Sequence, residues 1–167
     1  VRNSNSNIKR PAYKPVFFCI LHFETVVLDF YLLLPVFKQI LMFRTILIIG
    51  AGGFLGSVLR YLGQLAAGKI FPLSFPFGTF IINILGCFII GAVYALSEKG
   101  NLMTAEMRMF LTVGFCGGFT TFSTFSYDSL MLLKDSSLVF LLLNVFGSVL
   151  LGMLAVYGGI VLIRSII

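Results

Sequence analysis

Gly114-Phe-Cys-Gly-Gly-Phe-Thr-Thr-Phe-Ser-Thr-Phe-Ser-Tyr-Asp128 lies inside an apolar segment, residues 107–133, that is long enough to cross the roughly 30 Å of a bilayer's hydrocarbon as a helix. The glycines weaken a helix in the middle of the membrane. A break there frees backbone carbonyls and amides, which protein, water or an ion must satisfy. By spacing alone, the stretch favours close helix packing, because Gly114 and Gly118 form a small-xxx-small pair. An ion-binding break at Gly117–Thr120, with backbone carbonyls as ligands, is the other interpretation that stays open.

Three further apolar runs surround this segment, at residues 45–67, 77–97 and 138–163. Each is long enough to span a membrane, and the short connections between them hold most of the remaining charges. We therefore predict an all-α integral membrane protein with four transmembrane helices and a break in the third. Its expected location is the cell membrane, with multiple passes through the lipid bilayer.

The composition excludes several other classes of protein. Of the 167 residues, 59% are hydrophobic and 11% charged, against about 25% charged residues in soluble domains. The net charge of +6 comes from scattered residues that form no basic patch, so no nucleic-acid partner is expected. The single histidine, His22, and the three cysteines without CxxC spacing offer no metal cluster and no nucleophile–base set. The chain is not expected to be an enzyme.

The first 41 residues differ from the rest. A basic start is followed by an apolar run that contains Glu24 and Asp29, and such acids are costly inside a membrane. We expect Met42 to be the natural start, which makes residues 1–41 an N-terminal extension outside the native protein and residues 42–167 the four-helix domain. The alternative is a genuine extra interfacial or spanning helix.

Basic residues bias the orientation of these helices only weakly. From Met42 onward, four lysines and arginines fall on one side of a four-span topology and two on the other, with Arg60 able to join the second group. Such a chain can insert in both orientations, and dual insertion would allow an antiparallel dual-topology homodimer. The basic residues of the extension would remove this balance.

Polar and aromatic residues inside the spans are the candidate functional groups. Phe122 and Phe125 share a helix face, and their positive ring edges, together with hydroxyl donors, can replace part of an anion's water shell. Asn83 offers two amide hydrogens near the middle of its span. Arg60 can attract an anion into a vestibule. The alternatives are ordinary packing or lipid-facing rings, an interhelical hydrogen bond from Asn83, and a snorkelling Arg60.

Asn144 and Ser148 are one turn apart in the last span and favour the interhelical hydrogen-bonding alternative.

Three motifs resemble those of the CrcB/Fluc fluoride channels. These are residues 114–126, Pro76-Phe-Gly-Thr-Phe-Ile-Ile-Asn83-Ile-Leu-Gly86, and Gly52-Gly-x-x-Gly56-x-x-x-Arg60-Tyr61. The resemblance covers residues 42–167. It implies a fluoride-specific ion channel that lowers cytoplasmic fluoride by passive export, built as an antiparallel homodimer with two pores and a central structural sodium ion.

The resemblance also implies roles for individual residues. Gly117 and Thr120 would give backbone carbonyls to the sodium ion, and Phe122 and Phe125 would line the pore opposite Asn83. Ser123 and Thr124 are candidates for a hydroxyl track, without an indication of which one faces the pore.

Two features depart from the family pattern: Asp128, where Glu is common, and the N-terminal extension. The main alternative function is a small four-helix proton-coupled multidrug-type transporter, which needs a membrane-embedded carboxylate. A scaffold without transport activity is a third possibility.

Overall fold

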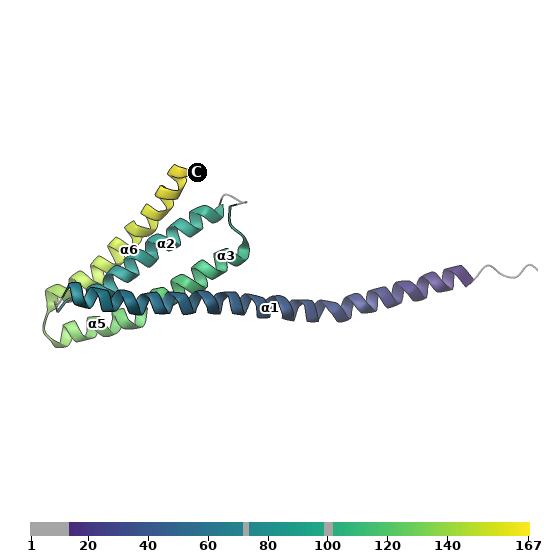
Figure 1. The fold of residues 1–167 in the computed structure, drawn as a ribbon, viewed down its shortest axis with the longest axis horizontal. Helices are drawn as coiled ribbons and strands as arrows, with labels where there is room; N and C mark the ends of the chain where they lie inside the picture. The colour runs from purple at the N-terminus through teal and green to yellow at the C-terminus, as the bar shows by residue number, and fades with distance from the viewer. Residues whose placement is uncertain (1–13, 72–73, 99–101) are drawn as a thin grey trace, which may run out of the picture. The chain divides into compact units, whose positions relative to one another are not determined.

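The computed structural model describes residues 14–71, 74–98 and 102–167, and every regular element in these ranges is helical (Figure 1). The chain divides into two compact units between Phe43 and Arg44, and each is described by itself. In the first unit the described backbone is helical from Lys14 onward. The elements, in chain order, are α1 (Lys14–Ile70), α2 (Phe77–Glu98), α3 (Ala105–Met109), η1 (Phe110–Cys116), α4 (Gly117–Phe119), α5 (Phe122–Lys134) and α6 (Leu138–Ile166).

Within the described residues, three helices are long and apolar enough to cross a membrane: Lys38–Ile70, Phe77–Glu98 and Leu138–Ile166. These match three of the four predicted spans and confirm the all-helical class of the fold. The remaining predicted span, residues 107–133, is the third in chain order. It corresponds to the succession of α3, η1, α4 and α5, and none of these elements alone is long enough to cross a membrane.

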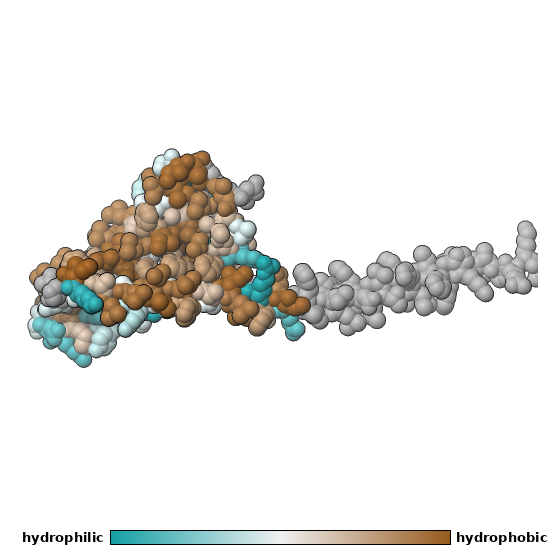
Figure 2. Space-filling view, in the orientation of Figure 1, coloured by the Kyte–Doolittle hydropathy of each residue, from teal (hydrophilic) through white to brown (hydrophobic). Residues whose placement is uncertain are grey.

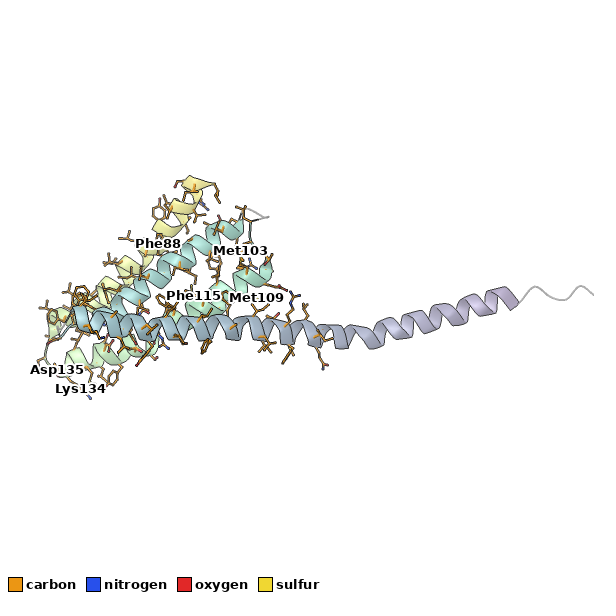
Figure 3. The ribbon with its side chains drawn as sticks, in the orientation of Figure 1. Phe88, Met103, Met109, Phe115, Lys134 and Asp135 are labelled. Carbon is orange, nitrogen blue, oxygen red and sulfur yellow. The ribbon has the colours of Figure 1, made fainter. Side chains whose placement is uncertain are left out.

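Helices α2 and α6 run side by side in the same direction (Figure 1). Glycines bring their backbones together: a Cβ atom added at Gly91 would meet the Val156 carbonyl, and one added at Gly159 would meet the carbonyl of Phe88, which Figure 3 labels. At their C-terminal ends, Arg164 of α6 forms an ion pair with Glu98 of α2, with 2.6 Å between Nη2 and Oε2. In lipid there is no hydrophobic driving force between apolar helices, so their association depends on close packing. The glycines allow this close packing of α2 and α6.

The part of α1 in the second unit packs closely against η1 and α4. A Cβ atom at Gly52 would lie 2.5 Å from the Phe110 carbonyl oxygen, and one at Gly114 would lie 2.7 Å from the Ile49 carbonyl oxygen. Glycine at these positions therefore allows backbone to touch backbone. This confirms the close-packing interpretation of Gly114.

The segment after α3 is a π-helix, η1, in place of the regular α-helix that the sequence predicted. Helix α4 follows and ends at Phe119, after which Thr120 (φ −85°, ψ 160°) and Thr121 (φ −151°, ψ 118°) are extended. Helix α5 then begins at Phe122, with the Thr121 hydroxyl accepting a hydrogen bond from the Thr124 amide at 3.2 Å. Irregular backbone of this kind is common at functional positions of helices.

The surface of the second unit is largely apolar. Figure 2 shows hydrophobic residues over most of its visible face. On α6, more than half of the surface of each of four apolar or aromatic residues is exposed: Leu150, Met153, Leu154 and Tyr157. Such a surface suits a lipid or a protein neighbour and not water.

Candidate functional site

The candidate site is centred on the two extended residues between α4 and α5. Asn83 of α2 faces them and makes two hydrogen bonds to the backbone of Thr121: its Oδ1 accepts from the Thr121 amide at 2.9 Å, and its Nδ2 donates to the Thr121 carbonyl at 3.2 Å. The backbone amide and the backbone carbonyl of Thr121 are thereby both hydrogen-bonded to a single side chain. Asn83 replaces the helical hydrogen bonds that the extended backbone gives up.

These bonds redirect two backbone amides. In a continuous helix the Thr121 amide would donate to the Gly117 carbonyl, but here it donates to Asn83. The Thr124 amide would donate to the Thr120 carbonyl, but here it donates to the Thr121 hydroxyl. The carbonyls of Gly117 and Thr120 are thus among those that lose their regular helical donors where α4 ends and α5 begins. A Cβ atom added at Gly117 would meet nothing within 4 Å, so the space beside it is open.

A cavity of about 410 Å³ adjoins the extended residues. Asn83, Gly117 and Thr120 line it, together with the rings of Phe122 and Phe125. These two rings lie 5.8 Å apart between centroids at an angle of 36°, as their spacing on one helix face predicted. The structure therefore brings the predicted amide, the predicted carbonyl residues and the predicted aromatic pair to one cavity.

A second cavity, of about 290 Å³, lies beside the first half of α5. Its polar lining comes from Gln64, Thr79, Thr124 and Asp128, while Ser123 lines neither cavity. The two candidates for a hydroxyl track thus differ: Thr124 faces a cavity and is half-buried, whereas Ser123 is exposed and contacts the Thr121 hydroxyl at 3.2 Å.

Arg60 is half-buried in α1 and belongs to neither of the two ion pairs found among the described residues. It lines neither of the two cavities described above. Its predicted role as a vestibule or structural cation stays a prediction.

Asn144 of α6 is completely buried, and its Nδ2 donates to the hydroxyl of Ser129 on α5 at 3.0 Å. This confirms the predicted interhelical hydrogen bond. Ser148, one turn later, lines the larger cavity. Within the described part of the chain, the Asn144 Oδ1 and Ser148 Oγ atoms are buried without a hydrogen-bond partner.

Thr121 has a central role in the site that the sequence did not predict. This residue caps α5 with its hydroxyl and binds Asn83 with its backbone. Threonine directly before the first residue of a helix is a preferred N-cap, and that preference is the signal that could have identified it. Among the described residues no group of three or more histidine, cysteine or acidic side chains could hold a metal ion.

The fold and the site define a helical membrane protein whose polar groups gather beside the two extended residues between α4 and α5. Residues 47–160 match the family described as "CrcB-like protein, Camphor Resistance (CrcB)". The chain belongs to this family.

Similar proteins carry one functional description. The "Fluoride-specific ion channel FluC" of Bacteroides fragilis is 52% identical over 119 residues, which cover 70% of this chain and 93% of that protein. The protein of the same name from Prosthecochloris aestuarii is 44% identical over 122 residues, 73% of this chain and 94% of its own length. The "Fluoride-specific ion channel FluC 1" of Methanosarcina acetivorans is 48% identical over 115 residues, 69% and 87% of the two chains.

Proposed function

We propose that this protein is a fluoride-specific ion channel that lowers cytoplasmic fluoride by passive export across the cell membrane. The observation that carries the proposal is the convergence of Asn83, Phe122 and Phe125 on one cavity beside the interruption between α4 and α5. The names of the similar proteins support the same ion.

Fluoride is small and strongly hydrated, so its pathway must replace water with hydrogen-bond donors and positive ring edges. Asn83 donates one amide hydrogen to the Thr121 carbonyl, and its second amide hydrogen can bind an anion. The side-by-side rings of Phe122 and Phe125 offer edges in the same cavity. Thr124 continues the path of donors toward the second cavity, with Ser123 as the other candidate. These groups are all neutral, which keeps binding weak enough for release.

The segment from α3 to α5 is proposed as the third of four transmembrane spans, broken at Thr120 and Thr121. Its ends, Ala105 and Lys134, enclose 30 residues, which is enough for a crossing of the hydrocarbon. The extended backbone of both threonines and the donors that Asn83 provides support this arrangement. Residues 42–167 would then form the channel domain.

A structural sodium ion is proposed at the carbonyls of Gly117 and Thr120. Carbonyl oxygen is a ligand type that hard cations prefer, and these two carbonyls lose their regular helical donors. The open space beside Gly117 is compatible with an ion there. When bound, the ion would neutralise the carbonyl dipoles and hold the interruption in place.

The same site supports an antiparallel homodimer. Two carbonyls from one chain are too few to surround a hard cation. A hard cation the size of calcium takes about six or more oxygen ligands. A two-fold axis through the ion would double the number of carbonyls. The exposed apolar surface and the weak charge bias are consistent with a second copy in the opposite orientation.

A proton-coupled multidrug-type transporter needs an acid within its spans. Among residues 44–167, the acids within the helices are Glu98, at the end of α2 in an ion pair, Glu106, at the start of α3 in another, and Asp128. Asp128 lines the smaller cavity, away from the interruption. The channel therefore remains the better supported function.

Fluoride efflux from liposomes tests the proposal. Vesicles containing the purified full chain are loaded with potassium fluoride, efflux is started with a potassium ionophore, and external fluoride is followed with an electrode. The unmodified protein should release fluoride, whereas Phe122→Ile and Asn83→Asp should abolish release while the protein still assembles. Phe146→Ile is the control, because Phe146 is an exposed ring on α6 that lines neither cavity. Absence of efflux from the unmodified protein would refute the channel, and unchanged efflux in both site variants would refute the site.

A further inference from the structure

Two asparagines on neighbouring helices bind α5 or the residue just before it. The two points that they bind lie before and after the pair Phe122 and Phe125 in the sequence. Asn83 of α2 holds the helix at Thr121, just before Phe122. Asn144 of α6 holds it at Ser129, one turn after Phe125. Both rings therefore belong to a stretch of backbone that is anchored before and after them.

The second anchor reaches Phe125 through two hydrogen bonds in series. Asn144 Nδ2 donates to Ser129 Oγ at 3.0 Å, and Ser129 Oγ donates to the Phe125 carbonyl at 2.8 Å. A hydroxyl has one hydrogen, and Ser129 gives it to Phe125, so only its lone pairs face Asn144. The direction of both bonds is therefore fixed, and only a donor at position 144 completes the series.

Stability alone does not account for an amide at this position. Asn144 is completely buried, and its Oδ1 has no hydrogen-bond partner among the described residues. A buried polar atom without a partner destabilises the folded state, so an apolar side chain of similar size would be tolerated or even favoured. What the amide adds is a directional contact between α6 and the backbone of Phe125.

We propose that Asn144 is a positioning residue for conduction: through Ser129 it holds the Phe125 ring in register with Asn83 across the larger cavity. The inference rests on the proposed function, since it assigns Asn144 a part in the pathway of the channel. Because α2 packs along α6, a bond from α6 to α5 sets the position of the ring relative to the Asn83 amide. An ion that passes between ring edge and amide needs both at the correct separation.

The test compares conduction with stability in the full chain. Asn144→Leu with Ser129→Ala replaces both partners by apolar groups, so no buried donor is left unpaired. Leu143→Ala is the control on the same helix, since Leu143 is 54% exposed. Fluoride efflux from liposomes is measured beside the thermal unfolding midpoint and the assembly state in detergent.

We expect the double variant to assemble, with a thermal unfolding midpoint equal to or above that of the unmodified protein. Its fluoride efflux should fall by about tenfold, which corresponds to ~1.4 kcal/mol in the barrier. Leu143→Ala should keep the original rate. Efflux from the double variant at the original rate would overturn the positioning role and leave the channel intact. Loss of the folded protein would also overturn it, because Asn144 would then be structural. Failure of the unmodified protein to conduct would refute the proposed function itself.

Discussion

Replacement of Gly52 by alanine tests the backbone-to-backbone contact between α1 and η1. The added Cβ would lie 2.5 Å from the Phe110 carbonyl oxygen and 2.9 Å from the Phe115 amide nitrogen, whereas ordinary van der Waals contacts begin at 3.4 Å. The segments must therefore separate by about 0.9 Å, the difference between 3.4 and 2.5 Å. Both obstructing atoms belong to the backbone, so no side-chain rotation can relieve the clash.

The expected cost follows from this separation. Overpacking of a well-packed site typically costs about 1–3 kcal/mol of unfolding free energy. Gly50→Ala is the matched control on the same helix, because its Cβ would meet nothing within 4 Å. It should stabilise the protein by up to about 1 kcal/mol, since alanine favours a helix over glycine. Gly52→Ala gains the same helix preference, so the two variants should differ by the overpacking cost of about 1–3 kcal/mol.

The protein contains no tryptophan, so circular dichroism of the helices is the suitable readout of unfolding in detergent. Gly52→Ala should unfold at a lower temperature than the unmodified protein, and Gly50→Ala at the same or a higher one. Equal midpoints for the two variants would show that α1 does not approach η1 closely enough to require glycine, and the packing argument would fail.

Three further outcomes follow from the second unit. Ser136, between Lys134–Asp135 and α6 (Figure 3), has a left-handed backbone with φ of 54°, so Ser136→Gly should raise the unfolding free energy by about 1 kcal/mol in a thermal melt. Thr121→Ala removes the hydroxyl that accepts from the Thr124 amide and should lower stability by about 0.5–2 kcal/mol, measured in the same way. Exchange of sodium for a large organic cation should weaken the dimer seen by size-exclusion chromatography, if the carbonyls of Gly117 and Thr120 hold the proposed ion.

Hydrophobic patterning predicted the long helices well. The apolar runs at 77–97 and 138–163 correspond closely to α2 (Phe77–Glu98) and α6 (Leu138–Ile166), because a membrane span needs a long stretch without charge. The spacing of Phe122 and Phe125 likewise predicted their contact, since both residues lie on one turn of helix.

Contacts between distant residues were not predictable in the same way. The sequence placed a break at Gly117–Thr120, but the extended residues are Thr120 and Thr121, because Asn83, 38 residues earlier, binds the Thr121 backbone. The hydrogen-bonding role of Asn144 was predicted, but its partner Ser129 was not. The π-helix η1 has no signal in the hydrophobic pattern, because the change concerns which backbone groups pair and not which side chains are apolar.

Asn83 connects the proposed anion pathway with the proposed cation site. Its Oδ1 takes the Thr121 amide away from the Gly117 carbonyl, and its Nδ2 is the donor beside the aromatic pair. The two functions are separable by substitution. Asn83→Asp keeps an oxygen for the Thr121 amide but removes the donor and adds negative charge, so fluoride efflux should cease while the proposed dimer persists. Asn83→Leu removes both, so the Thr121 amide should return toward Gly117 and the dimer should weaken as well. If the two variants kept the dimer equally well, Asn83 would have no part in freeing the Gly117 carbonyl.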